Sequence, residues 1–528
     1  WTGAPYQAGW PVGPPNVIYS SVCIDDLDGD GSLEIVVGSK DQHVHVWEHD
    51  GTERPGWPRP TGDMVWSSPC IANLDSDPEK EILAGSNDGK LYGWNHDGTG
   101  IRNEDGFFRS LGGDVRGAPT VDDIDGDLDL EILISNSYGE VFCWHHEGTG
   151  YLQPNGSWGH ASGSIYSSVG LADFDGDDSL EVIAGGTGGG IYIWNHDGTG
   201  YLNPDGFFVT TNSIYGSVAI GDVEGNGDME VVMGGMFWQG VAVYDDDATF
   251  SVGWPKNTVG YVRSSPALAD LDGDDRLDII VGTSRVYLTD DSCYVYVFSH
   301  DGIVRPGWPK ASTGEFESSP VVGDIDGDGD PEILIGCTDN HLYAWHADGT
   351  PVKGWPRYVI HEIYSTPAIC DLDGDGDVEV VVGGYDGLVH VFDLSAPYDP
   401  EAMEWPKHNH DTFNSQLYGG PSKAGVEGDE PGGLPAKLML MAYPSPAVSN
   451  VTVRLGVPST NSGEYSVDVF DVRGRHIRNL VNGTLDAGYH NASWDCEDSG
   501  GRQVSSGIYF VKVSGKHADL TRKLVVVR

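Results

Sequence analysis

Basic residues are scarce in this chain. Its 528 residues include 29 Lys and Arg against 81 Asp and Glu, which gives a formal net charge of −52. Nucleic-acid phosphates attract the opposite charge, so this composition excludes a nucleic-acid partner. The shortage is uneven along the chain: residues 434–528 hold 11 basic and 8 acidic residues, net +3, and the residues before them hold 18 and 73, net −55.

Long apolar runs and paired cysteines are also missing. No run approaches the roughly 20 residues that cross a bilayer. The chain starts at Trp1 without a Met or a signal peptide, so we expect a processed product that is secreted to the cell surface or beyond. Its seven cysteines form no Cys-x-x-Cys pair and are predicted to be small buried residues. A disulfide between neighbouring repeats is the alternative.

No stretch shows a helical period, and what recurs instead is a short acidic loop. Eight copies carry Asp, Glu or Asn at loop positions 1, 3, 5 and 9, and they start 47 to 54 residues apart. The eight sets are Asp26/Asp28/Asp30/Glu34, Asn73/Asp75/Asp77/Glu81, Asp123/Asp125/Asp127/Glu131, Asp173/Asp175/Asp177/Glu181, Asp222/Glu224/Asn226/Glu230, Asp270/Asp272/Asp274/Asp278, Asp324/Asp326/Asp328/Glu332 and Asp371/Asp373/Asp375/Glu379. A period near fifty indicates a repeat architecture.

The chemistry of these loops favours Ca²⁺. Calcium takes six to eight oxygen ligands, and alternating carboxylates on a glycine-rich turn can point several oxygens at one centre. We therefore predict up to eight Ca²⁺ ions, one per repeat, which would offset 16 of the negative charges. A structural role for these ions is favoured over one in binding a ligand or polarising a substrate.

The segments around each loop read as four short strands. An apolar strand precedes the loop, as at residues 67–72, and another follows it, as at residues 332–336. A third alternates and ends on an aromatic residue, as at residues 43–47, and a fourth begins near Gly-Trp-Pro. Four antiparallel strands repeated eight times predict an eight-bladed β-propeller, with seven blades as the alternative. Trp10-Pro11 and Trp405-Pro406 both carry the fourth-strand signature, so either end could complete the last blade.

The Asp-x-Asp-Gly-Asp-Gly-x-x-Glu loops, each followed by an Ile/Val strand, resemble the FG-GAP/VCBS repeats of integrin-α-like β-propellers. The resemblance covers roughly residues 10–418. It implies that each loop joins the first two strands of a blade and binds Ca²⁺ through positions 1, 3, 5 and 9 and a carbonyl at position 7. The fifth copy departs from the pattern with Glu224 and Asn226, and the second departs with Asn73 and Pro78.

A Gly- and Pro-rich linker at residues 419–434 separates the propeller, residues 1–418, from a C-terminal domain, residues 435–528. About seven short alternating strands predict an immunoglobulin-like sandwich there. The stretches 443–447, 469–474 and 506–511 resemble the C-terminal sorting domains of type IX secretion and the Ig-like domain of flagellar hook-capping proteins. The resemblance implies an exported protein, in which this domain serves as an address or as a structural joint.

Aromatic residues recur at the end of the third strand of each repeat. They are Trp47, Trp94, Trp144, Trp194, Tyr244, Phe298, Trp345 and Phe392. Packing between blades is the favoured role, and a sugar-stacking platform is the alternative. The His residues of the His-Asp-Gly turns are predicted to bond locally rather than to bind a transition metal.

These features predict a non-enzymatic, calcium-stabilised surface protein with a structural or adhesive role. Contacts between the acidic propeller and the mildly basic tail domain would link copies head to tail into an assembly or filament. One alternative is a lectin-like module that binds surface glycans or other surface proteins through the longer loops of three blades. The other is a calcium-dependent polysaccharide lyase, although an acidic propeller would repel polyuronates.

Overall fold

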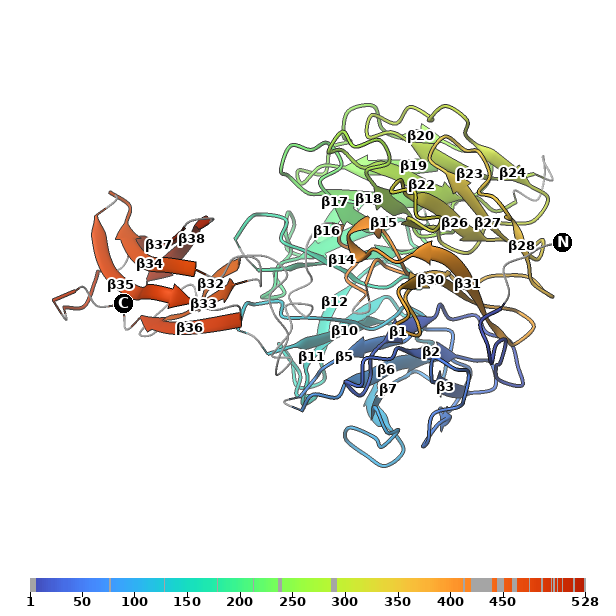
Figure 1. Ribbon diagram of the computed structural model, residues 1–528, viewed down its shortest axis with the longest axis horizontal. Coiled ribbons are helices and arrows are strands. Elements are labelled where there is room, and N and C mark those ends of the chain that lie inside the picture. The colour runs from blue at the N-terminus through green and yellow to red at the C-terminus, as the bar shows by residue number, and fades with distance from the viewer. Residues whose placement is uncertain are drawn as a thin grey trace. The chain divides into compact units, whose positions relative to one another are not determined.

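We analysed a computed structural model of the chain. It describes residues 6–75, 77–127, 129–177, 179–211, 213–235, 240–285, 292–411, 414–418, 439–443, 451–457, 463–473, 475–485, 488–494, 496, 499–500, 502–505, 507–515 and 518–526. The predicted linker at residues 419–434 lies outside the described residues. The strands fall into two compact units, β1–β31 and β32–β38, and each is described by itself (Figure 1).

The described strands of the first unit form eight successive antiparallel sheets, which we number as blades 1 to 8. Blade 1 comprises β1 (Cys23–Asp25), β2 (Glu34–Gly38), β3 (His43–Trp47) and β4 (Arg59–Pro60), and blade 2 comprises β5 (Cys70–Ala72), β6 (Glu81–Ser86), β7 (Lys90–Asn95) and β8 (Phe107–Ser110). Blade 3 comprises β9 (Thr120–Asp122), β10 (Glu131–Ser135), β11 (Glu140–His145) and β12 (Ser157–His160), and blade 4 comprises β13 (Gly170–Ala172), β14 (Glu181–Gly186), β15 (Gly190–Trp194) and β16 (Phe207–Thr210). Blade 5 comprises β17 (Ala219–Gly221), β18 (Glu230–Gly235), β19 (Gly240–Tyr244) and β20 (Lys256–Asn257), and blade 6 comprises β21 (Ala267–Ala269), β22 (Asp278–Gly282), β23 (Cys293–Phe298) and β24 (Lys310–Ser312). Blade 7 comprises β25 (Val321–Gly323), β26 (Glu332–Gly336), β27 (His341–His346) and β28 (Arg357–Tyr358), and blade 8 comprises β29 (Ala368–Cys370), β30 (Asp377–Gly383) and β31 (Val389–Pro397). The all-β propeller predicted from the repeats is confirmed.

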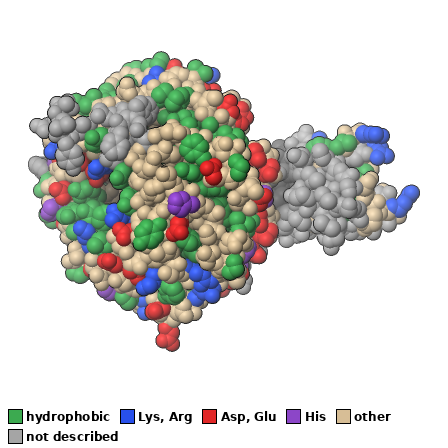
Figure 2. Space-filling view, turned by 180° about the vertical axis from the view of Figure 1, so that it is seen from behind, with side chains coloured by type: hydrophobic (Ala, Val, Ile, Leu, Met, Phe, Trp, Pro, Cys, Tyr) green, Lys and Arg blue, Asp and Glu red, His purple; other side chains and the backbone are tan. Residues whose placement is uncertain are grey.

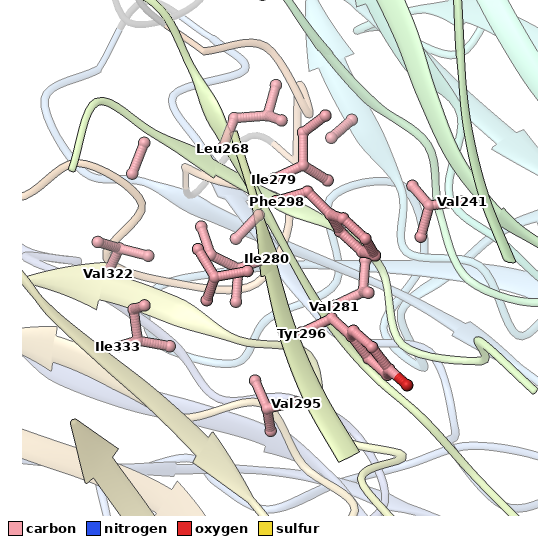
Figure 3. Packing of buried hydrophobic residues seen from close by; sticks show 14 of the residues in the cluster. Val241, Leu268, Ile279, Ile280, Val281, Val295, Tyr296, Phe298, Val322 and Ile333 are labelled. Atoms are coloured by element: carbon pink, nitrogen blue, oxygen red, sulfur yellow. The ribbon is translucent and has the colours of Figure 1, made fainter. Parts of the chain in front are cut away.

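The second strand of each blade is buried on both faces, because neighbouring blades pack against it. In blade 1 every residue of β2 is buried, which explains its run of Ile and Val without a polar face. Figure 3 shows this packing at blade 6, where Ile279 and Ile280 lie between Val241 of blade 5 and Val322 of blade 7. Each hydrophobic cluster of the first unit spans at least two adjacent blades.

The recurring aromatic residues of the third strands are part of these cores. Trp47, Trp94 and Trp144 are 4%, 0% and 0% exposed, and the other five members of the set are also buried. Packing between blades is therefore their role. The alternative of a sugar-stacking platform at this repeat position is wrong, because a buried ring offers no face to a ligand. All seven cysteines are buried as well.

The N-terminal segment completes blade 8. Tyr6 and Val12 form antiparallel bridges with Phe392 and Val389 of β31, the last strand in the sheet of that blade. Trp10 donates its Nε1–H to the His49 carbonyl of blade 1, as the Trp residues of other blades do to the next blade. Blades 8 and 1 also share one hydrophobic cluster. Of the two ends that could have closed the last blade, the N-terminal one does so.

The segment that follows β31 enters the middle of the propeller instead. After a short 3-10 turn, η1 (Pro400–Ala402), Trp405 forms a bridge with Val322 of the innermost strand β25. Leu417 forms a parallel bridge with Ile220 of β17, and Asn414 donates to the Pro119 carbonyl before β9 (2.9 Å). These contacts reach the innermost strands of three blades. Trp405-Pro406 is therefore no fourth strand, and residues 399–411 and 414–418, which we name the axial plug, lie at the propeller axis.

The second unit is a two-sheet sandwich, which confirms the predicted Ig-like fold. Its strands are β32 (Met439–Tyr443), β33 (Val451–Val457), β34 (Gly463–Asp471), β35 (His476–Leu485), β36 (Gly488–Trp494), β37 (Gly507–Gly515) and β38 (Ala518–Val526). The sheet orders are β32-β33-β36 and β35-β34-β37-β38. Alternating residues such as Val453, Val467 and Val511 pack around the fully buried Trp494.

No helix among the described residues is long and apolar enough to span a membrane.

At four of the five Gly-Trp-Pro motifs, those of Gly9, Gly56, Gly253 and Gly307, the turn of the following blade leaves no room for a Cβ beside the glycine. Gly56 has φ +94°, and a Cβ there would lie 2.2 Å from the Asp97 carbonyl oxygen of blade 2. Gly354 has nearly the same conformation, φ +90°, but its nearest neighbour is the flexible Arg357 side chain at 3.6 Å. A comparison of substitutions at the two glycines therefore distinguishes the effect of backbone strain from the effect of contact between blades.

We predict that Gly56→Ala lowers thermal stability more than Gly354→Ala does. Both variants strain the backbone, but only Gly56→Ala also forces two blades apart, at an added cost of about 1–3 kcal/mol. Calorimetric melting of the two variants measures the difference. Equal melting temperatures would show that the contact between blades contributes nothing.

Candidate metal centres

Each acidic loop joins the first two strands of its blade. In blade 1 the loop begins directly after β1 with Asp26 and ends on Glu34, the first residue of β2. The short first strand and the buried second strand hold both ends of the loop. Asp26 is partly exposed, whereas Glu34 is 0% exposed. Position 9 is therefore the inner wall of the loop.

One hydrogen bond is shared by all eight loops. The backbone N–H of position 2 donates to one oxygen of the position-9 carboxylate, over 2.6 to 3.2 Å. The pairs are Leu27–Glu34, Leu74–Glu81, Ile124–Glu131, Phe174–Glu181, Val223–Glu230, Leu271–Asp278, Ile325–Glu332 and Leu372–Glu379. This bond uses one carboxylate oxygen and turns the other toward the loop.

Positions 1 and 5 shape the turn. The Asp26 carboxylate accepts the N–H groups of Gly29 (2.8 Å) and Gly31 (2.9 Å), and Asp324 accepts the equivalent N–H groups in blade 7. Asp30 accepts the Ser32 N–H at 2.8 Å, and the position-5 residue of every other loop accepts in the same way. The loop is thus preorganised by its own amides.

Many of the predicted ligands come together in space. Among the described residues, eight groups of at least three side chains place potential ligand atoms within 4.8 Å of one another. Five of these groups are Asp26/Asp28/Glu34, Asp75/Asp77/Glu81, Asp123/Asp125/Asp127, Asp173/Asp175/Glu181 and Asp326/Glu332/His346. Loop 3 is grouped without Glu131, whose Oε1 lies 2.9 Å from His145 Nδ1. Such clusters could hold a metal ion.

The position-5 side chains are predicted to bind the cation together with positions 1, 3 and 9, and this stays a prediction. All eight are exposed: Asp30, Asp77, Asp127, Asp177, Asn226, Asp274, Asp328 and Asp375. Three of the five groups named above, those from loops 1, 4 and 7, are made without a position-5 residue.

The turn that follows position 5 explains why these side chains are exposed. One side-chain oxygen of each residue accepts the N–H two places further on, as Asp177 does from Ser179 (2.8 Å) and Asp328 does from Asp330 (3.0 Å). Asp274 and Asp375 accept in the same way, over 3.1 and 2.9 Å. These bonds hold position 5 at the solvent side of the loop. A second carboxylate oxygen is left for a cation in seven loops, whereas Asn226 has no side-chain oxygen besides the one that accepts the Asp228 N–H.

Burial favours the protonated, uncharged form of the position-9 carboxyl groups in the absence of a cation. Removal from water raises the pKa of Glu81 to about 8, although the N–H of Leu74 partly offsets this. The same cause raises the pKa of Glu34, Glu181, Glu230 and Glu379 to about 8 and that of Asp278 to about 6. A divalent cation in the loop would compensate these charges, since burying an unpaired carboxylate is unfavourable.

Unused oxygens in the loops fit a cation. Glu34 Oε1, Asn73 Oδ1 and Asp371 Oδ1 are buried and have no hydrogen-bond donor within the described part of the chain. Buried acceptors of this kind are rare unless an ion or a water occupies them. The oxygen-only donor sets of loops 1, 2 and 8 match the preference of Ca²⁺.

Side chains from outside the loop approach position 3, and sequence reasoning missed them. Arg54 Nη2 contacts Asp28 (2.7 Å), Gln7 Nε2 donates to Asp373 (2.9 Å), and Arg305 Nη2 lies 3.2 Å from Asp272. Each of these residues stands three places before the Trp of its Trp-Pro motif, at Trp57, Trp10 and Trp308. That constant offset is the sequence signal from which these contacts could have been predicted. Arg54 and Arg305 supply part of the positive charge that the carboxylates of loops 1 and 6 require.

Two histidines at the end of the third strand were also missed. His145 and His346 each place Nδ1 2.9 Å from the position-9 carboxylate of their blade. Burial lowers the pKa of His346, but the hydrogen bond to Glu332 and the negative charges of Glu332, Asp326 and Asp328 together outweigh this effect and raise it. Both residues follow the Trp of the third strand, where other blades carry Glu, Asn, Asp or Ser.

The two loops with divergent sequences also differ in structure. In loop 2, Asn73 donates its Nδ2–H to the Asp77 carbonyl (2.7 Å). In loop 5, Glu224 accepts the Val252 N–H from the following turn (3.2 Å). A cavity of about 470 Å³ adjoins loop 2, and its lining includes Asp75, Glu81, Arg102, His146 and Glu147.

Comparison with known families identifies both parts of the chain. The profile of the FG-GAP-like repeat matches residues 123–184, 270–335 and 324–382, which include loops 3, 4, 6, 7 and 8. The profile of the FlgD Ig-like domain matches residues 445–519. The chain carries FG-GAP-like repeats followed by a FlgD Ig-like domain. No curated protein sequence matches it.

Several solved structures share low similarity with the chain. The Dos1 propeller is 11% identical, with a TM-score of 0.47 over 75% of this chain and 97% of that one. The V. cholerae biofilm matrix protein Bap1 is 13% identical, with a TM-score of 0.37 over 99% and 70%. BBS1N in complex with ARL6DN is 9% identical, with a TM-score of 0.41 over 75% and 98%.

We predict that the metal-free protein loses stability as the pH rises. The position-9 carboxylates bind protons more tightly in the folded chain, at a pKa of about 8 for Glu81 against an ordinary value of 4.5. Their contribution is fully present below about pH 4.5 and is lost as the pH passes through about 8. Melting temperatures measured in a chelator should therefore fall across this window, and added Ca²⁺ should weaken the trend. Glu81→Gln should reduce the slope, and a chelated melting temperature that stays level or rises would contradict the assignment.

We predict that Arg54→Met destabilises the chelated protein by about 1–3 kcal/mol, because the buried Glu34 loses its neighbouring cation. The loss should be smaller with Ca²⁺ bound, since the ion supplies the missing charge. Arg357→Met is the matched control, because Arg357 is also buried and no ion pair joins it to a loop within the described residues. Denaturant unfolding with and without Ca²⁺ measures both variants. Equal losses for Arg54→Met in the two conditions would rule out this compensation.

Proposed function

We propose that this chain is a non-enzymatic, calcium-stabilised protein of an extracellular surface, where it serves as a structural or adhesive subunit. The observation that carries the proposal is the separation of charge between its two units. The segment before residue 434 has a net charge of −55, and the segment from residue 434 onward has a net charge of +3. Complementary charges steer two copies toward a head-to-tail contact.

Three of the eleven basic residues from residue 434 onward lie on one hairpin. Arg473 and Arg475 lie at the turn between β34 and β35 and are exposed, and Arg478 follows within β35. Val472 beside them is 62% exposed. Figure 2 shows Lys and Arg side chains gathered on the described part of the tail unit. We name residues 472–473 and 475–478 the basic hairpin and propose that they dock on the acidic propeller of a second copy.

A contact of this kind is heterologous, because the two partner surfaces differ. Heterologous contacts produce open filaments when the rotation between copies does not close a ring. Calcium supports the proposal in two ways: it would hold the blades and would lower the repulsion between acidic propellers. Export by a type IX-like route belongs to the same proposal, supported by the resemblance of the tail domain to sorting domains.

The polysaccharide-lyase alternative receives little support from the cavity beside loop 2. Arg102 and His146 line it, but so do the three carboxylates Asp75, Glu81 and Glu147. An acidic sugar would be repelled there unless the loop held a cation.

The prediction is that the protein forms ordered fibres or sheets with Ca²⁺ and that a chelator disperses them. Negative-stain microscopy of the full chain tests this directly. Arg475→Glu should prevent assembly, because it reverses a charge at the centre of the basic hairpin. Arg502→Glu makes the same change of charge on an exposed residue of the same unit and should leave assembly intact. Isolated particles under all conditions would overturn the proposal.

A further inference from the structure

Five aromatic side chains surround the propeller axis on the side away from the acidic loops. They occupy one repeat position, a few residues before the first strand of a blade, whereas the acidic loop follows that strand. They are Tyr19, Trp66, Tyr166, Tyr215 and Tyr364. An apolar residue precedes each of them and is buried, as Ile18 and Val65 are. The aromatic residue itself remains accessible, and Tyr215 is 39% exposed.

The same position holds a charged residue in the three other blades: Arg116, Arg263 and Glu317. Arg263 pairs with Glu317 over 2.7 Å, and Arg116 pairs with Asp114 over 2.9 Å. The arginines are therefore neutralised within the protein. A ligand at this position needs no negative charge to bind.

Contacts between neighbours turn these eight positions into a ring. Tyr19 stacks on Trp66, with ring centroids 4.6 Å apart, and lies 5.2 Å from Tyr364. The Arg116 guanidinium lies over Trp66 (4.4 Å) and Tyr166 (4.8 Å). Tyr166 lies 5.8 Å from Tyr215, which Arg263 approaches at 6.0 Å. We name this set the axial ring.

The chain fills the axis next to the axial ring. Asn409 of the axial plug donates to the Ser168 hydroxyl (2.9 Å), two residues after Tyr166. Asn414 donates to the Pro119 carbonyl, three residues after Arg116. The ring therefore borders a filled axis and offers a platform rather than a tunnel.

Polar groups on the ring add hydrogen-bonding capacity. Tyr166, Tyr215 and Tyr364 are partly or fully accessible and carry phenolic hydroxyls, whereas Trp66 Nε1 and the Nε atoms of Arg116 and Arg263 are buried. Burial raises the pKa of Tyr364 to about 12, so its hydroxyl remains a donor at neutral pH. Aromatic faces combined with such donors suit a ligand that is itself both apolar and hydroxylated.

We propose that the axial ring binds a neutral oligosaccharide, with pyranose C–H faces stacked on Tyr166 and Tyr215. A pyranose has one apolar face and an equatorial rim of hydroxyls, which matches aromatic faces bordered by donors. The internally paired arginines favour a neutral sugar over an acidic one. The inference gives the proposed adhesive function a ligand class, and sugar binding by single copies is independent of assembly.

The test is isothermal titration of the full chain, with Ca²⁺, against cellohexaose, xylohexaose, mannohexaose and chitohexaose, with hexagalacturonate as the acidic probe. At least one neutral hexasaccharide should bind with a dissociation constant below about 1 mM. The double variant Tyr166→Ala/Tyr215→Ala should weaken binding by about tenfold or more, because it removes both stacking faces.

Tyr138→Ala is the matched control. Tyr138 is 64% exposed, lies in the turn between β10 and β11 and is outside the ring, so this variant should bind as the parent does. Thermal melting of all variants confirms that they are folded. Binding of hexagalacturonate alone, binding of no neutral probe, or full binding by the double variant would each overturn the proposal. None of these results bears on fibre formation, which microscopy measures separately.

Discussion

Every blade of the propeller depends on its neighbours for part of its core. The second strands are apolar on both faces, and each hydrophobic cluster is shared between blades, so a single blade would expose half of its apolar surface. This constraint explains why the chain brings its N-terminal segment back to blade 8. Tyr6 and Val12 pair with the last strand of the sheet, and Trp10 bonds to blade 1 as its counterparts do elsewhere. The ring is thereby joined without a disulfide having to hold it.

The acidic loops add a second constraint to the same blades. A carboxylate at position 9 starts or enters the strand that both neighbours cover, so it is buried whether or not a cation is present. Its hydrogen bond to position 2 satisfies one oxygen only. Arg54 and Arg305 form ion pairs with carboxylates of loops 1 and 6, and His145 and His346 contact the position-9 carboxylates of loops 3 and 7. The blades thus differ in how much of the compensating charge the chain itself supplies, and the proposed cation would matter most in the other loops.

Much of this architecture could be predicted from the sequence, because the signals are local and repeated. Strand β3 has the bounds that alternation gave it, and the acidic loops join the strands they were expected to join. Contacts between distant segments had no such signal. Trp405-Pro406 carries the same dipeptide as Trp10-Pro11, yet it lies against Val322 at the axis. Gln7 lies beside Asp373 because the N-terminal segment pairs with blade 8, although the two residues are 366 positions apart in the sequence. The axial ring was missed because one aromatic residue per repeat looks the same in a core and on a surface.

The central claim is that Ca²⁺ holds the blades of this propeller. The most direct test is the metal content of the native protein after dialysis against equal concentrations of Ca²⁺ and Mg²⁺, followed by calorimetric melting before and after chelation. The account predicts several equivalents of calcium per chain, up to eight, little magnesium, and a melting temperature that falls when calcium is removed. Protein that retains no calcium and melts at the same temperature in a chelator would contradict it.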